Sequence, residues 1–154
     1  MGLFERWRTP VEPPWAPPAL GLCQCEEHVE ALADHTVPSL ESTEVSVGEL
    51  LAHEALDARP VLPDDRFVTL PHSGQRLGPF HYLVRITETR GRLFDDAAPA
   101  ALDDTLSTQA GVERVHRDGL ELFRVGAPRM CASGVMAAMV RALDNPRLRL
   151  THDA

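Results

Sequence analysis

The chain has 154 residues, of which 44% are hydrophobic and 25% are charged. This length and composition are typical of one globular domain, and the lack of any run of about 18 apolar residues excludes a membrane-spanning helix. Fifteen arginines and no lysine stand against 23 acidic residues, so the net charge is −8. Because nucleic-acid binding usually starts from a basic surface, this charge argues against nucleic acids and anionic membranes as partners.

The acidic residues are concentrated in the first part of the chain. Between Thr9 and Ala58 there are ten acidic residues and no arginine, whereas the stretch from Arg59 onward carries thirteen arginines and twelve acidic residues. This asymmetry predicts an acidic N-terminal layer whose charges are solvated or paired with arginines of the same chain. The alternative is an acidic face that binds a basic partner.

Residues 1–18 are predicted to form an extended, proline-rich arm. Five prolines between positions 9 and 18 fix φ and remove backbone donors, which bars both a helix and a central strand. The proline segment around Trp15 could dock in an aromatic groove of a partner. We favour the alternative, in which Trp15 packs on the chain's own domain.

The N-terminal sequence and the number of cysteines indicate the cellular compartment of the protein. Residues 1–8 contain no apolar segment of the kind that defines a signal peptide. Three cysteines are too few for a disulfide framework. The lack of such a framework is typical of proteins from a reducing compartment. The sequence therefore predicts a cytoplasmic protein.

The remaining residues, 19–154, are predicted to form a single α+β domain that begins with an acidic helical segment over 22–60. Apolar residues at spacings of three and four predict a first helix over 22–35. Ser46 followed by Glu49 matches a capping box and predicts a second helix, which Pro60 would close.

The segment 61–146 is predicted to supply a sheet and two more helices. Alternating apolar residues predict a strand over 80–86, after a shorter one over 66–70, and a helix is expected between Asp95-Asp96 and Gly111. Asp118-Gly119 predicts a hairpin over 112–125 whose two-residue turn would pair Val115 with Leu122.

A continuous apolar stripe predicts a last helix from Cys131 to Asp144. The order of strand, strand, helix, hairpin and helix indicates a two-layer α+β sandwich. Its small, mostly antiparallel sheet would carry helices packed on one face, preceded by the helical segment and the arm.

Three residues near the N-terminus are candidate metal ligands: Cys23, Cys25 and His28. Thiolate and imidazole are the ligands that zinc prefers, and copper is the alternative metal. On a helix Cys25 and His28 would share a face, with Cys23 joining from its start, whereas His35 would lie about 10 Å beyond His28. The set therefore has three candidate ligands and no evident fourth. The alternative is that the cysteines fill space as small buried residues.

Cys131 is a separate candidate for thiol chemistry. It stands at the start of the last predicted helix, where free backbone N–H groups and Arg129 would stabilise a thiolate. His116 on the neighbouring hairpin is a possible base for it. The alternative is a buried cysteine that acts as a small apolar residue.

No other pattern in the chain points to a known chemistry. There is no glycine-rich phosphate loop, no nucleophile elbow and no metalloprotease motif. The sequence therefore favours a non-catalytic protein-interaction or regulatory domain, acting on a protein partner or as a homodimer, over an enzyme. Metal binding by Cys23, Cys25 and His28, and a thiol enzyme or redox sensor based on Cys131, are the two alternatives.

Overall fold

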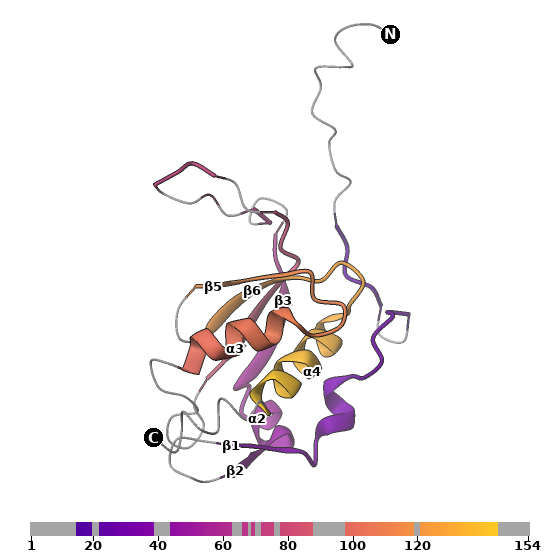
Figure 1. Cartoon of the computed structure of the whole chain (residues 1–154). Helices are drawn as coiled ribbons and strands as arrows, with labels where there is room; N and C mark the ends of the chain where they lie inside the picture. The colour runs from indigo at the N-terminus through magenta and orange to yellow at the C-terminus, as the bar shows by residue number, and fades with distance from the viewer. Residues whose placement is uncertain are drawn as a thin grey trace, which may run out of the picture.

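The structure, a computed structural model, describes residues 15–19, 22–38, 44–62, 66–67, 69, 72–75, 78–87, 98–118 and 121–144. The first fourteen residues of the predicted arm and the predicted helix start at 95–96 lie outside this part of the chain. The described residues form two antiparallel sheets with helices packed against them (Figure 1). The predicted α+β class is therefore confirmed.

Short helices and strands make up most of the described residues. In chain order they are the 3-10 helix η1 (Val29–Leu32), β1 (Thr36–Pro38), β2 (Glu44–Ser46), α2 (Val47–Ala52), β3 (Leu56–Pro60), β4 (Tyr82–Ile86), α3 (Ala98–Ser107), β5 (Arg114–Arg117), β6 (Leu122–Gly126) and α4 (Ala132–Leu143). No helix in the described part of the chain has the length and apolar character needed to cross a bilayer.

The larger sheet has four antiparallel strands in the order β3-β4-β6-β5. Helix α4 packs against β3 and β4, and α3 packs against β5 and α4, so both helices lie on the same face (Figure 1). On β4 the residues Tyr82, Val84 and Ile86 are buried on this face, while Leu83 and Arg85 point to the other. This is the predicted two-layer arrangement.

Two of the elements best defined by sequence periodicity are found where they were expected. The predicted strand over 80–86 corresponds to β4, and the predicted last helix corresponds to α4, which Cys131 caps. Val135, Met139 and Val140 are fully buried on α4, whereas Met136 is only partly buried.

The predicted helix over 22–35 is wrong, because only Val29–Leu32 is helical and in the 3-10 form. His28, just before it, has an extended backbone. The amide of Val29 donates to Ser133 Oγ at 3.1 Å, a bond to α4 that takes the place of an intrahelical bond. Tertiary contacts with α4 therefore override the local helical spacing.

The second predicted helix is confirmed at its start and wrong at its end. Ser46 Oγ accepts a hydrogen bond from the amide of Glu49 at 3.1 Å, as the capping box predicts. The helix ends at Ala52 because Glu54 adopts a positive φ of 55°, which a helix cannot continue through. Leu56 then belongs to strand β3 and pairs with β4.

The predicted hairpin exists, but its register is different. Val115 pairs with Val125 and not with Leu122, so the connection is longer than two residues. The observed register puts Val115 on the same face as the buried Phe123 and Val125. Burial of this apolar face therefore outweighs the preference of Asp-Gly for a tight turn.

Tyr82 links the sheet to the segment that enters α4. Its hydroxyl donates to the backbone carbonyl of Met130, and the whole side chain is buried. The ring of Trp15 packs edge-on against it, with ring centroids 5.1 Å apart. Trp15 therefore packs on the chain's own domain, as favoured from the sequence.

Replacing Tyr82 by phenylalanine is expected to destabilise the domain without altering the fold. The substitution keeps the ring and removes the only hydroxyl that it carries, so the buried carbonyl of Met130 loses its donor. An unsatisfied buried carbonyl costs about 1–3 kcal/mol, which urea unfolding would measure. A change below about 0.5 kcal/mol would contradict this role for the hydroxyl.

Candidate metal centre

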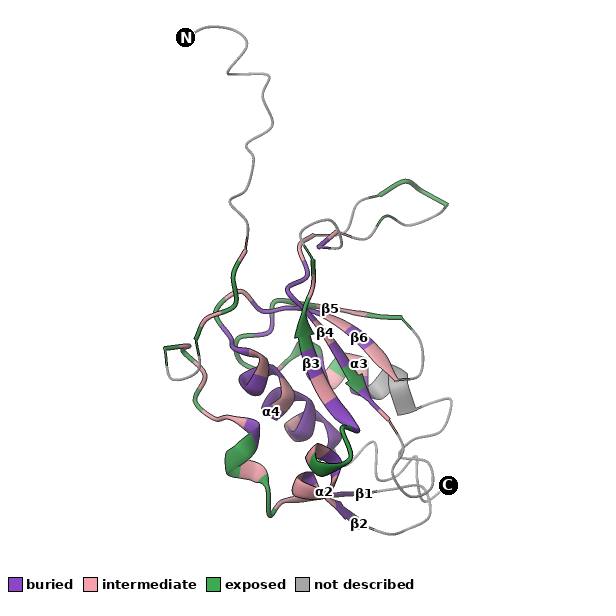
Figure 2. Ribbon diagram, turned by 180° about the vertical axis from the view of Figure 1, so that it is seen from behind, coloured by how far each residue is buried: buried purple, intermediate pink, exposed green. Residues whose placement is uncertain are grey.

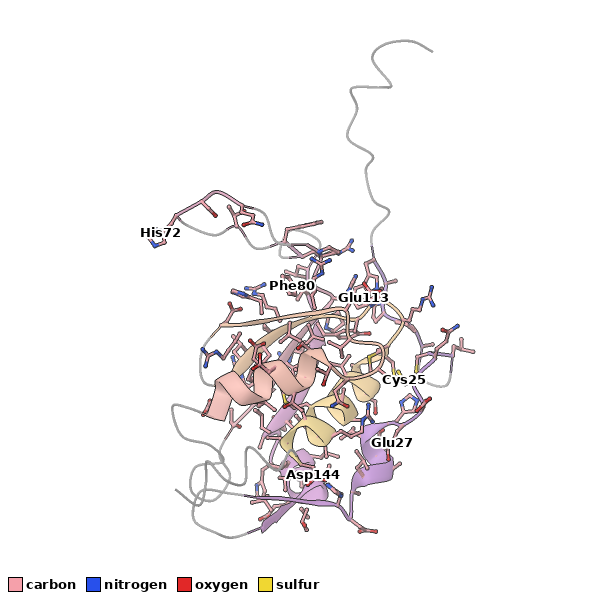
Figure 3. All side chains as sticks on the ribbon, viewed as in Figure 1. Cys25, Glu27, His72, Phe80, Glu113 and Asp144 are labelled. Carbon is pink, nitrogen blue, oxygen red and sulfur yellow. The ribbon has the colours of Figure 1, made fainter. Side chains whose placement is uncertain are left out.

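The three cysteines of the chain lie together at the N-terminal end of α4. The sulfurs of Cys23, Cys25 and Cys131 are all within 4.8 Å of one another, although the first two are more than 100 residues from the third in sequence. Cys131 Sγ is 3.0 Å from Cys23 Sγ and 3.8 Å from Cys25 Sγ. Figure 3 shows Cys25 between the N-terminal segment and the start of α4. The structure thus joins two sets of residues that the sequence had suggested separately.

His28 lies beside this cluster and contacts two of its sulfurs. Its Nε2 lies 3.5 Å from Cys23 Sγ, and its Nδ1 lies 3.3 Å from Cys131 Sγ. Cys131 therefore joins the predicted set as a fourth candidate ligand. The four side chains make a Cys₃His set, one of the compositions that structural zinc sites use.

Two of the distances between these atoms match those of tetrahedral zinc coordination, and one is shorter. Zinc bond lengths of about 2.3 Å to sulfur and 2.0–2.1 Å to nitrogen place ligand sulfurs about 3.8 Å apart and sulfur and nitrogen about 3.5 Å apart. The distances from Cys25 to Cys131 and from Cys23 to His28 match these values. Cys23 and Cys131 are closer, so an ion between them would move their sulfurs apart by about 0.8 Å.

Backbone groups hold the sulfurs in place. The amide of Cys131 donates to Cys25 Sγ at 3.4 Å, and the amide of Gly134 donates to Cys131 Sγ at 3.4 Å. The amide of Gln24 also donates to the carbonyl of Arg129 at 3.4 Å. These bonds fasten the Cys23–Cys25 segment to the first turn of α4. Hydrogen bonds of this kind orient the ligands of metal sites.

Gly134 is part of the centre, although no sequence motif singled it out. A Cβ at this position would lie 2.2 Å from Cys25 Sγ and 2.9 Å from Cys25 Cβ. Only a glycine therefore lets Cys25 approach the helix this closely. The signal in the sequence is a glycine in the first turn of a helix, where alanine has the better helix propensity.

A second group of contacts orients the segment that carries His28. Ser133 Oγ donates to the Glu30 carboxylate and thereby lowers the pKa of Glu30, while Ser133 Oγ accepts from the amide of Val29. Glu27 forms an ion pair with Arg141 at 3.1 Å. The acidic N-terminal segment is thus attached to α4 on both sides of His28.

The thiols differ in acidity. Burial raises the pKa of Cys23, but hydrogen bonds from the Cys131 side chain and from the backbone of Cys25 outweigh it and bring the pKa to about 6. Burial, together with the bond to Cys23, raises the pKa of Cys131 to about 12, and burial also raises the pKa of Cys25. Cys23 is therefore the thiol of the cluster that loses its proton most readily. A bound divalent cation would displace the other protons.

The other predicted site residues lie elsewhere. His116 contacts Asp118 at 3.3 Å and packs beside Phe80, so it is not a base for Cys131. His35 contacts Asp144 at 2.5 Å and stays apart from the cluster, as its spacing from His28 predicted. A polar hollow of about 600 Å³ borders His28 and is lined by residues of the N-terminal segment, α4 and the turn after α3.

Comparisons with known proteins gave no match. No protein-family model, no curated protein and no solved structure is significantly similar to the chain. The geometry of the cluster is therefore the basis on which a function can be assigned.

Proposed function

We propose that the protein binds one zinc ion through Cys23, Cys25, His28 and Cys131, and that this ion holds the N-terminal segment on the domain. The observation that carries this proposal is the convergence of three cysteines and a histidine from two distant segments. Free cysteines placed as inert packing would not need a histidine in contact with two of them. Metal binding was an alternative on sequence grounds, and the geometry now makes it the leading one.

The ligand types favour zinc over copper. Three thiolates and one imidazole at tetrahedral spacing form a set that zinc uses in closed structural sites. Copper(I) is also bound by thiolates, so it is the competing metal. The imidazole contacts Cys23 through Nε2 and Cys131 through Nδ1, so the ring would turn one of these nitrogens toward the ion on binding.

The same set favours a non-catalytic role. Catalytic zinc keeps a position open for water or substrate, whereas four protein ligands would fill all positions. Cys131 is 3% exposed and its pKa is raised, which is the opposite of what a reactive thiol needs. These features support a zinc-stabilised interaction or regulatory domain over a thiol enzyme based on Cys131.

The metal content of the purified protein tests the proposal. Protein made without a histidine tag in zinc-supplemented medium should contain about one zinc per chain by elemental analysis, because structural sites hold zinc tightly. Cys131→Ser and His28→Ala should each lower the zinc affinity at least about tenfold. His72, which lies on an exposed loop away from the cluster (Figure 3), provides the matched control His72→Ala.

Two results would contradict this assignment. Wild-type protein with less than about a tenth of an equivalent of any transition metal, after exposure to zinc, would exclude a structural site. Protein that contains one equivalent of copper and no zinc would show that the site binds copper and that the assignment to zinc is wrong.

A further inference from the structure

Strand β3 lies at the edge of the four-stranded sheet, and no described strand pairs with its outer side (Figure 2). The amide of Thr87 donates to the carbonyl of Ala55, and the amide of Val61 donates to the carbonyl of His81. In an antiparallel pair such bonds recur at every second residue. The backbone groups of Leu56 and Ala58 therefore point away from β4, toward the open edge.

A hollow runs along this edge. A cavity of about 530 Å³ is lined by residues of β3 and β4, by Leu51 and Glu54 at the end of α2, and by Met136 of α4. Leu56 and Met136 belong to the helix side of the sheet, while Asp57 and Arg59 belong to the opposite side. The lining residues come from both faces of β3, although Ala58 at the centre of the strand is buried and does not line the cavity. An open edge of this kind is a template for another strand.

The sequence of β3 is complementary to itself. When two copies of β3 pair in antiparallel fashion about a two-fold axis at Ala58, Asp57 of each copy lies opposite Arg59 of the other. Both side chains are exposed, with exposed fractions of 42% and 80%, and they lie on the face that no described helix covers. Opposite charges in directly facing positions stabilise a pair of strands.

The backbone groups fit the same register. The amide and carbonyl of Ala58 in one copy would bond the carbonyl and amide of Ala58 in the other. The amide of Leu56 would donate to the carbonyl of Pro60 in the second copy. Pro60 has no backbone N–H, so it cannot donate a hydrogen bond to the carbonyl of Leu56 in the other copy. The dimer therefore lacks one hydrogen bond at each end of the strand pair.

The neighbouring registers are unfavourable. Keeping the outward backbone groups of β3 paired allows the axis to move only to Asp57 or to Arg59. An axis at Asp57 places the two Asp57 carboxylates opposite each other, and an axis at Arg59 places the two guanidinium groups opposite each other. Like charges in facing positions destabilise a pair of strands. The charges thus select the register centred on Ala58.

We propose that the protein forms a two-fold symmetric homodimer through β3, which joins the two four-stranded sheets into one continuous sheet. Such an interface is isologous, since each copy supplies the same patch. Leu56 and Met136 of each copy border the new strand pair from the helix side. The ion pair between Arg59 and Asp57 within each chain, at 2.6 Å, is exchanged for a pair across the interface, so the dimer keeps two such pairs. This inference stands independently of the metal centre.

Charge reversal tests this dimer. Sedimentation equilibrium of the wild-type protein at about 100 µM should give twice the 17.0 kDa mass of one chain, because dimer formation depends on concentration. Asp57→Arg and Arg59→Asp should each weaken dimerisation at least about tenfold, since each places like charges in facing positions. The double variant that carries both changes should recover the wild-type dimerisation constant.

Arg117→Asp provides the matched control, because Arg117 is an exposed arginine on β5, the opposite edge of the sheet. It should leave dimerisation unchanged, and circular dichroism should show that every variant is folded. A monomeric wild-type protein would overturn the proposal. So would single variants that dimerise normally, a double variant that stays monomeric, or a dimer that Arg117→Asp disrupts. Zinc content measured on the same samples should not change, which separates this result from that for the metal centre.

Discussion

Replacing Gly134 by alanine is expected to destroy the metal centre. In an ordinary helix position this substitution stabilises the chain by about 1 kcal/mol, because alanine has the higher helix propensity. Here the new methyl group would lie 2.2 Å from Cys25 Sγ, and the sulfur would have to move out of the cluster. We expect the zinc affinity to fall at least about tenfold, as competition with a chromophoric chelator would measure.

The opposite substitution on the same helix is the control. Ala132 lies two residues earlier in α4, so Ala132→Gly lowers helix propensity by a similar amount without adding an atom near Cys25. This variant should lose about 1 kcal/mol of stability and keep its zinc. A Gly134→Ala protein that is more stable than the wild type and binds zinc with unchanged affinity would show that Cys25 is not a ligand.

Removing the metal is expected to lower the melting temperature by about 10 °C. A ligand at about a thousand times its dissociation constant stabilises the folded state by about 4 kcal/mol. For a domain of this size each kcal/mol shifts the melting temperature by roughly 2–4 °C. Differential scanning calorimetry with and without a strong chelator measures the shift.

Removal of the metal should unfold the segment around the cluster before it unfolds the whole domain. Residues 23–30 are attached to α4 by the cluster and by a few hydrogen bonds and one ion pair, whereas β4 and β6 are held by the sheet and the core. Amide exchange in the presence of chelator should therefore accelerate first in residues 23–30. The His28→Ala protein should show little response to chelator. A wild-type melting temperature that does not change on chelation would exclude a stabilising role for the ion.

The fold could be predicted from the sequence where one local pattern was strong. The alternation over β4 and the apolar stripe of α4 each have a single period, and both elements were predicted nearly residue for residue. The capping box at Ser46 was also confirmed. The register predicted for the hairpin was wrong, because burial of Phe123 and Val125 is a property of the assembled sheet and not of the turn residues.

The candidate site was predicted in two halves. Cys23, Cys25 and His28 were singled out by ligand type, and Cys131 by its place at a helix start, but nothing in the sequence indicated that they meet. The expected helix over 22–35 gave His28 the wrong surroundings. In the structure the backbone before Val29 is extended, which turns the imidazole toward Cys131. Contacts between residues more than 100 positions apart produce no periodic pattern in the sequence from which they could be predicted.

The sequence separation of the ligands also sets when the ion acts during folding. Three of them lie within six residues of one another, while Cys131 stands 108 residues after Cys23. An ion captured by the early ligands closes its loop only after the intervening sheet has brought the last helix into position. Closing a loop of this length restricts the unfolded chain by roughly 4–5 kcal/mol in the chain-entropy estimate for crosslinks. The proposed zinc ion would therefore be bound tightly only by chains whose sheet and last helix have already folded.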